Sequence, residues 1–430
     1  MSSSAFSLLF ATFLLISVAI RLWLATRQIR HVGQHRQRLP TAFEQRIGLS
    51  AHQRAADYTI ARSRLGMAEQ TVSAVVLLLL TLLGGLQQLQ QRWQTWLPDN
   101  PLWQQMGIVV SAILLIGLFE LPLDLWRHFR LESRFGFNRM TPGLFIADRL
   151  KGMLVGAVLG LPLLAALIGL MQASGSLWWL WAWLLWTGFS VAMLLIYPAV
   201  IAPIFNRFEP MPEGPVRTRI EALLERCRFA ASGLFVMDGS RRSAHGNAYF
   251  AGMGRSRRIV FFDTLLERLD ADEIEAVLAH ELGHFKKRHI QKRLVLQIGF
   301  SLASFALLGW LSAQPWFYQG LGVTPDPAQP APAGIALLLF FLVAPVFSFV
   351  LRPVMAWLSR RDEFEADAFA VAHSRGQALI SALTKLYEDN ASTLTPDPVH
   401  SAFYDSHPPA AIRIAHIERQ LGASTQSASA

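Results

Sequence analysis

The chain has 430 residues, of which 52% are hydrophobic, and its mean hydropathy is +0.33. This apolar content excludes an ordinary soluble protein and leaves room for several membrane spans beside a globular domain. A formal net charge of +9 could indicate a nucleic-acid partner, but basic residues beside long apolar runs are typical of loops that contact anionic lipid. We therefore expect a lipid bilayer, and no nucleic acid, among the partners.

Several apolar runs are long enough to cross a bilayer core about 30 Å thick, which needs about 20 residues of helix. The first run has no positive charge before it and is followed by arginines, so we expect an uncleaved span rather than a signal peptide. In chain order the seven predicted spans cover residues 4–25, 67–86, 106–125, 153–171, 177–200, 294–313 and 333–351.

The connections between these spans alternate in charge. Arginines crowd the first and third connections, whereas 172–176 is uncharged and 314–332 holds a single charged residue. Because cytoplasmic loops retain Lys and Arg, the predicted orientation places the amino terminus outside and the carboxyl terminus in the cytoplasm. Only five of the 39 basic residues are lysines, a usage typical of GC-rich bacterial genomes, so we predict a multi-pass protein of the bacterial inner (plasma) membrane.

This topology leaves two large cytoplasmic regions that must assemble one domain. The fold class is predominantly α, and the single cysteine, Cys227, excludes an intrachain disulfide and a thiolate metal site. The predicted divisions are spans one to five with their loops (1–200), the first part of the cytoplasmic domain (201–293), spans six and seven (294–351), the second part of the domain (352–420) and a disordered tail (421–430).

A helix with a metal-binding pattern is predicted after Asp270. Asp270 and Glu273 form a capping box, and the helix runs on into the segment His280-Glu281-Leu282-Gly283-His284. Histidines at positions i and i+4 share one helix face, about 6 Å apart, so both can reach one ion while Glu281 polarises the remaining water ligand. The pattern predicts one catalytic Zn²⁺ per chain, with Glu281 as the base.

A third protein ligand is expected from the acidic segment 362–367. Glu363 and Asp367 share a helix face, so one can bind the metal while the other accepts the second ring proton of a zinc histidine, a role that suits Asp367. Spacing alone does not exclude Asp362 or Glu365 as the ligand.

Two further segments are candidates for contacts with a substrate. His407 stands just before the rigid Pro408-Pro409 turn, where it could donate a hydrogen bond to an oxyanion. Residues 247–250 and 259–262 predict two strands of a hairpin. If the first strand lies at a sheet edge, it could hold an extended peptide by main-chain pairing.

At these residues the chain resembles the CAAX prenyl protease type I family, integral membrane zinc metalloendopeptidases that are also related to bacterial heat-shock membrane proteases. The resemblance covers roughly residues 110–415. The segments that carry it are Phe119-Glu120-Leu121-Pro122, Phe135-Gly136-Phe137-Asn138, Ala202-Pro203-Ile204-Phe205-Asn206, Arg242 through Phe250, the zinc-motif segment, Glu363 through Asp367, and Ser406-His407-Pro408-Pro409.

The resemblance implies seven helices around an intramembrane chamber, capped on the cytoplasmic side by a thermolysin-like zinc metallopeptidase domain. It implies that Glu363 is the third zinc ligand and that Asp367 orients a ligand. It further implies that the substrate strand binds along Asn247, Ala248 and Tyr249. It also implies that His407 and Arg413 lie beside the scissile carbonyl.

The expected function is hydrolysis of peptide bonds in a peptide or protein substrate that is prenylated or membrane-embedded. The carboxyl tail lacks the dilysine signal of many eukaryotic members, which fits a bacterial membrane without farnesylated substrates. A general quality-control protease for misfolded or stalled membrane proteins is the alternative. A non-catalytic scaffold with structural zinc is disfavoured, because structural sites close all four positions and usually use cysteine.

Overall fold

The computed structural model describes residues 1–252, 257–325 and 332–428, so part of the connection 314–332 lies outside the described residues. Within these ranges, seven helices are long and apolar enough to span a membrane, which confirms the predicted number. They are α1 (Ser3–His35), α2 (Leu49–Leu80), α4 (Pro101–Trp126) continued to Glu132, α5 (Pro142–Ala173), α6 (Trp178–Ile196) within the helical stretch Gly175–Phe205, α11 (His289–Leu311), and α13 (Ala333–Ser348) continued to His373.

Several of these helices are longer than the apolar runs that predicted them. Helix α1 has 33 residues and is therefore about 50 Å long, more than a bilayer core of about 30 Å. The predicted end of the second span, at residue 86, is wrong. Helix α2 stops at Leu80, and α3 (Gly85–Trp96) begins after a turn in which Gly84 has a φ of 77°, a left-handed conformation that interrupts a helix.

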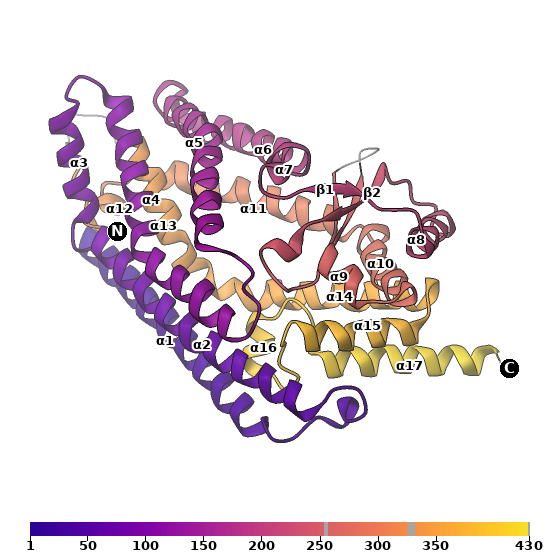
Figure 1. Ribbon diagram of the computed structural model, residues 1–430. Coiled ribbons are helices and arrows are strands. Elements are labelled where there is room, and N and C mark those ends of the chain that lie inside the picture. The colour runs from indigo at the N-terminus through magenta and orange to yellow at the C-terminus, as the bar shows by residue number, and fades with distance from the viewer. Residues whose placement is uncertain (253–256, 326–331, 429–430) are drawn as a thin grey trace.

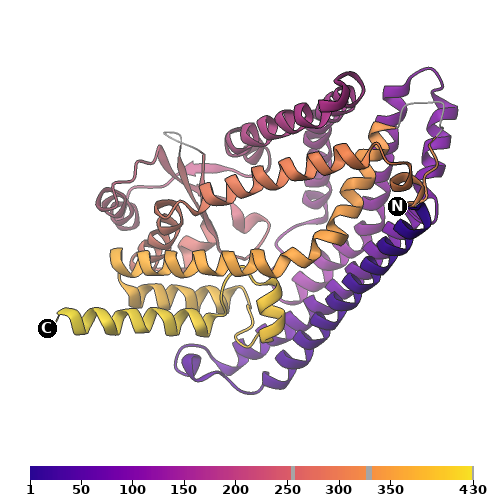
Figure 2. The same cartoon turned by 180° about the vertical axis from the view of Figure 1, so that it is seen from behind.

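Helices α1 and α2 lie side by side along one edge of the molecule, as both views show (Figures 1 and 2). At the other end, a sheet and the helices around it form a second body. Helix α13 leads through the short turn Phe349–Leu351 directly into α14 (Arg352–His373), so that one continuous stretch of helix joins the spans to this body.

The sheet has four strands in the order β1-β2-β4-β3. Strands β2 and β4 are parallel, and the outer strands β1 and β3 pair antiparallel with them. The predicted hairpin is confirmed, because β3 pairs with β4 and lies at one edge of the sheet. The strands are β1 (Phe208–Pro210), β2 (Gly233–Met237), β3 (Ala248–Ala251) and β4 (Arg258–Phe262).

Helices from both predicted cytoplasmic regions share one apolar core with this sheet. Helix α17 extends to Ala428, the last described residue, and the predicted disorder of the tail stays a prediction. The remaining helices are α7 (Ala202–Phe205), α8 (Pro215–Arg226), α9 (Asp263–Arg268), α10 (Ala271–Lys286), α12 (Pro315–Gln319), α15 (Gly376–Asp389), α16 (Pro398–Tyr404) and α17 (Ala410–Ala428).

Helix α10 begins with the predicted capping box. The Asp270 side chain accepts a hydrogen bond from the Glu273 amide at 2.9 Å, and the Glu273 side chain accepts one from the Asp270 amide at 2.8 Å. The same Glu273 carboxylate binds Lys385 Nζ at 2.7 Å and the Ser381 hydroxyl at 2.6 Å, both on α15. The cap therefore fixes the start of α10 and also attaches it to α15.

Close packing of α10 against α14 depends on Gly283. A Cβ atom added at Gly283 would lie 2.9 Å from the Ala366 Cα, 3.0 Å from the Ala366 carbonyl oxygen and 3.1 Å from the Phe369 Cβ. Because two of these atoms belong to the α14 backbone, the two helices would have to separate to make room. The glycine thus sets the distance between α10 and α14.

Replacing Gly283 by Ala is expected to lower the free energy of unfolding by about 1–3 kcal/mol, because overpacking a tight contact forces the backbone to shift. Thermal unfolding in detergent measures the change. Gly299→Ala on α11 is the matched control, because a Cβ there meets nothing within 4 Å. Equal unfolding temperatures for the two variants would contradict the proposed role of Gly283.

Candidate metal centre

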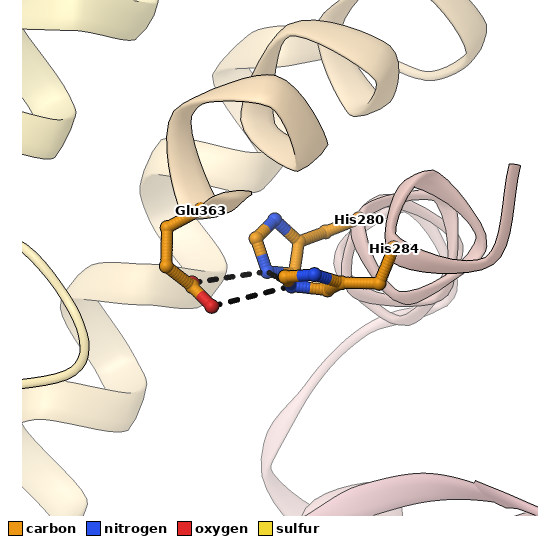
Figure 3. A group of neighbouring side chains, drawn as sticks. All are labelled: His280, His284 and Glu363. Carbon is orange, nitrogen blue, oxygen red and sulfur yellow. Dashed lines mark hydrogen bonds and ion pairs between the residues drawn. The ribbon is translucent and has the colours of Figure 1, made fainter. Parts of the chain in front are cut away.

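Two histidines on α10 and one glutamate on α14 converge at one point (Figure 3). Nε2 of His280 lies 3.2 Å from Nε2 of His284, because residues four apart on a helix share a face. The Glu363 carboxylate faces both rings, with Oε2 3.4 Å from Nε2 of His280 and Oε1 3.2 Å from Nε2 of His284. One ligand atom from each of the three lies within 4.8 Å of the others.

This donor set fits a divalent cation. Two imidazole nitrogens and one carboxylate oxygen are ligands that zinc takes in catalytic sites, where a fourth position stays open. Glu363 is 3% exposed, and its Oε2 atom makes no hydrogen bond to any described residue. A buried charged oxygen normally has such a partner, and a metal ion at this point would supply it.

The neighbouring carboxylates point elsewhere. Asp362 Oδ2 lies 3.2 Å from Nη2 of Arg293, and Glu365 Oε2 lies 3.1 Å from Nε2 of His289. Both partners belong to α11, whereas Glu363 faces α10. The different directions of these side chains from α14 therefore distinguish three carboxylates that spacing alone left as alternatives.

Asp367, the carboxylate expected to orient a ligand, lies behind His280. Its Oδ1 atom is 2.8 Å from Nδ1 of His280, so this ring nitrogen donates to the carboxylate and leaves Nε2 free to bind a metal. Arg413 holds the same carboxylate through Nε at 2.9 Å and Nη2 at 2.5 Å, and both Asp367 and Arg413 are buried. Arg413, expected beside the scissile carbonyl, also lines the cavity described below.

Glu281 follows His280 on α10 and faces the same cavity. Burial raises the pKa of the Glu281 carboxyl above its ordinary value. A raised pKa makes this carboxylate a stronger base than an exposed glutamate, which suits a group that takes a proton from water.

His407 reaches the site from the loop before α17. Its Nε2 atom lies 3.4 Å from Oε1 of Glu363, and its Nδ1 lies 3.0 Å from the Ser406 hydroxyl oxygen. The His407 side chain is 60% exposed and lines the cavity. His407 therefore stands beside Glu363 and is open to the cavity.

A cavity of about 930 Å³ adjoins these residues and extends between the domain and helices α1 and α2. Its wall includes Arg21 and Gln28 on α1 and Arg62 and Gln70 on α2. Polar side chains on helices that could span a membrane indicate a cavity that holds water or polar parts of a ligand.

The edge strand β3 borders this cavity. Asn247 and Ala248 line it, whereas Tyr249 is turned the other way, with its hydroxyl 3.9 Å from the Met237 sulfur. Ala248 and Tyr249 point to opposite faces, as successive residues of a strand do, whereas Asn247 lies just before the strand. Of the three predicted substrate-strand residues, two therefore face the site.

One residue near the ligands was not singled out from the sequence. His289 lies 3.0 Å from His284, Nδ1 to Nδ1, and is 1% exposed. A histidine five residues after the motif, across a helix break, has no periodic relation to it, so spacing could not place it there.

Two family models match the chain. Residues 28–207 match the model described as CAAX prenyl protease N-terminal, five membrane helices, and residues 210–421 match peptidase family M48. Among curated proteins, the CAAX prenyl protease 1 homolog of Taenia solium is 38% identical, covering 72% of this chain and 71% of its own. The CAAX prenyl protease 1 homolog of Caenorhabditis elegans is 31% identical, covering 96% of this chain and 98% of its own.

The fold is also similar to a solved structure. The crystal structure of S. mikatae Ste24p superimposes with a TM-score of 0.89 at 28% sequence identity, covering 96% of this chain and 99% of that chain. The arrangement of spans and domain described above is therefore shared along nearly the whole length of both chains.

Replacing His284 by Ala is expected to lower the bound metal well below one ion per chain, because one of three protein ligands is removed. Elemental analysis of the purified protein measures the metal content. His373→Ala is the control, because His373 is exposed on α14 and its Nδ1 contacts the Phe369 carbonyl oxygen at 2.9 Å. An unchanged metal content in the His284 variant would remove this residue from the site.

Proposed function

Because the chain belongs to the CAAX prenyl protease family of M48 peptidases, we propose that it hydrolyses peptide bonds with one zinc ion held by His280, His284 and Glu363. The protein is an integral, multi-pass membrane metalloendopeptidase. The observation that carries the assignment of the ligands is the convergence of two Nε2 atoms and one carboxylate within 4.8 Å, beside Glu281 in the same cavity.

Zinc bound at this site would act as a Lewis acid and lower the pKa of a coordinated water toward about 7. The protein's own groups then move the protons. Glu281 takes a proton from the attacking water and later gives it to the leaving amine, a sequence that its raised pKa favours.

His407 is the proposed donor to the oxygen of the scissile carbonyl. It lies 3.4 Å from a ligand carboxylate and is open to the cavity, so a carbonyl next to the metal site is within reach of its ring. A hydrogen bond to an oxygen that gains negative charge stabilises the transition state more than the ground state. Arg413, which holds Asp367, is also proposed to lie beside the scissile carbonyl.

The substrate is proposed to bind as an extra strand on the free edge of β3. Main-chain pairing along residues 247–249 would hold an extended peptide across the metal, and the side chains of Asn247 and Ala248 would face it from the cavity wall. The backbone around Tyr249 contributes to the pairing although its side chain is turned away.

The substrate class is proposed from the relatives, which are CAAX prenyl proteases by name. Prenylated carboxyl-terminal peptides are the proposed occupants of the cavity that extends from the metal centre to α1 and α2. Quality control of misfolded or stalled membrane proteins is the second candidate, because the same cavity would accept an unprenylated segment.

The proposed location is a bacterial plasma membrane with the active site and carboxyl terminus on the cytoplasmic side. The basic connections support this orientation, because Lys and Arg are retained in the cytoplasm. The preference for arginine over lysine supports the bacterial source.

Replacing Glu281 by Gln is expected to leave zinc bound while lowering peptide hydrolysis by at least about a hundredfold, because the amide cannot accept the proton of water. A quenched fluorescent peptide and elemental analysis, applied to the same detergent preparation, measure both quantities. Glu267→Gln on the exposed side of α9 is the matched control. Turnover at the wild-type rate by the Glu281 variant would refute its role as base.

The proposed substrate class is tested with pairs of quenched peptides that have one sequence and differ only in a prenyl group. We expect the prenylated peptide to have a kcat/KM at least about tenfold higher, since tenfold is the effect of burying about two methylene groups. The Glu281→Gln protein serves as the blank. Equal values of kcat/KM for the two peptides would favour the quality-control function.

A further inference from the structure

The outer nitrogen of His284 contacts a third histidine rather than a carboxylate. Its Nδ1 lies 3.0 Å from Nδ1 of His289, the first residue of α11. His289 is 1% exposed, and its Nε2 lies 3.1 Å from Oε2 of Glu365 and 3.7 Å from Oδ1 of Asp362. A chain of polar contacts therefore runs from two carboxylates on α14 through His289 to the back of His284.

These contacts determine where the protons lie. Nε2 of His289 faces carboxylate oxygens, which only accept, so this nitrogen carries a proton. When His289 is neutral, this proton is its only one, which leaves Nδ1 of His289 as an acceptor. At 3.0 Å the two Nδ1 atoms share one hydrogen bond, so His284 donates, and its own Nε2 keeps a lone pair for a cation held jointly with Glu363.

The opposite arrangement would block metal binding. If Nδ1 of His289 carried the proton, Nδ1 of His284 would have to accept, and the proton of a neutral His284 would then stand on Nε2. A protonated Nε2 has no lone pair for a metal. Nδ1 of His289, acting as an acceptor, therefore favours the tautomer of His284 with its proton on Nδ1 and a free Nε2.

We propose that His289, held by Glu365, is a positioning residue that fixes His284 in the ring orientation and tautomer needed for metal binding. The inference rests on the proposed function, because it gives His284 the role of ligand. Each of the two proposed histidine ligands then has an acceptor behind its Nδ1 atom. Asp367 accepts from His280 directly, whereas His284 donates to His289, which in turn donates to Glu365.

The backbone supports this assignment. Arg288, between α10 and α11, has φ 60° and ψ 29°, a left-handed conformation that a residue with a Cβ adopts at a cost in free energy. Helix α10 ends at Lys286, and the turn at Arg288 two residues later brings the first residue of α11 back onto the last turn of α10. The strained turn therefore places the His289 ring against His284.

The carboxylates that receive the His289 proton are themselves held by cations. Arg293 on α11 lies 3.2 Å from Asp362, and Arg361 on α14 lies 3.7 Å from Glu365. Neighbouring guanidinium groups favour the ionised carboxylate, which is an acceptor only. The ionised Glu365 and Asp362 therefore favour the tautomer of His289 that carries its proton on Nε2.

Two substitutions of His289 separate the acceptor from the bulk of the ring. Asparagine places an amide oxygen near the position of Nδ1 and can still accept from His284, whereas leucine cannot. We expect His289→Leu to weaken zinc binding by about 10–100-fold and His289→Asn to retain most of the wild-type affinity. Affinity is measured on the full-length protein in detergent, without substrate, by competition with a chromophoric chelator.

The visible absorption spectrum of the cobalt-substituted protein provides a second readout, because it reports the ligands and geometry of the metal. His289→Leu is expected to change this spectrum, and His289→Asn to preserve it. His373→Leu makes the same chemical change at an exposed histidine on α14 and should leave both measurements unaltered.

Wild-type affinity and spectrum in His289→Leu would overturn the proposal, and so would an equal loss in the leucine and asparagine variants, since the bulk of the ring would then be responsible. These outcomes do not depend on turnover. If the wild-type protein bound zinc with the expected dependence on His289 but cleaved no peptide, the proposed hydrolysis would fail and the positioning role would stand.

Discussion

The close contact between α10 and α14 is the constraint on which the site depends. Both histidine ligands lie on α10 and the carboxylate lies on α14, so the distance between the two helices decides whether three donors can meet. A glycine at position 283 lets the α14 backbone approach to a distance that any side chain would prevent. The capping box at Asp270 and the contacts of Glu273 with α15 then hold α10 in its place along this contact.

Hydrogen-bond acceptors behind His280 and His284 leave Nε2 of each ring facing the proposed metal site. Buried carboxylates are costly unless they are paired, and here each one has a defined partner. Asp367 is held by Arg413 and accepts from His280, and Glu365 accepts from His289. Glu363 has a buried oxygen, Oε2, without a hydrogen bond to the described residues, at the point where a cation would sit.

The cavity extends from this centre to helices α1 and α2. Its walls come from α1 and α2 on one side and from the domain on the other, and β3 offers a free sheet edge along it. A peptide on that edge would pass Glu281 and His407 while its end, or an attached lipid, extended toward the spans. The family's solved relative has the same arrangement over nearly its whole chain, so the combination of chamber and domain belongs to the fold itself.

The sequence by itself determined the features that depend on neighbours along the chain: seven apolar spans, the cap at Asp270, the hairpin edge and two histidines on one helix face. Apolar length could not show that α2 ends at Leu80, because that end depends on the backbone turn at Thr81 and Gly84. Only the tertiary structure turned Glu363 toward α10 and its neighbours toward α11, and only a strained turn at Arg288 brought His289 behind His284. Helical periodicity describes which residues share a face, but which faces meet is decided by packing between segments far apart in the sequence.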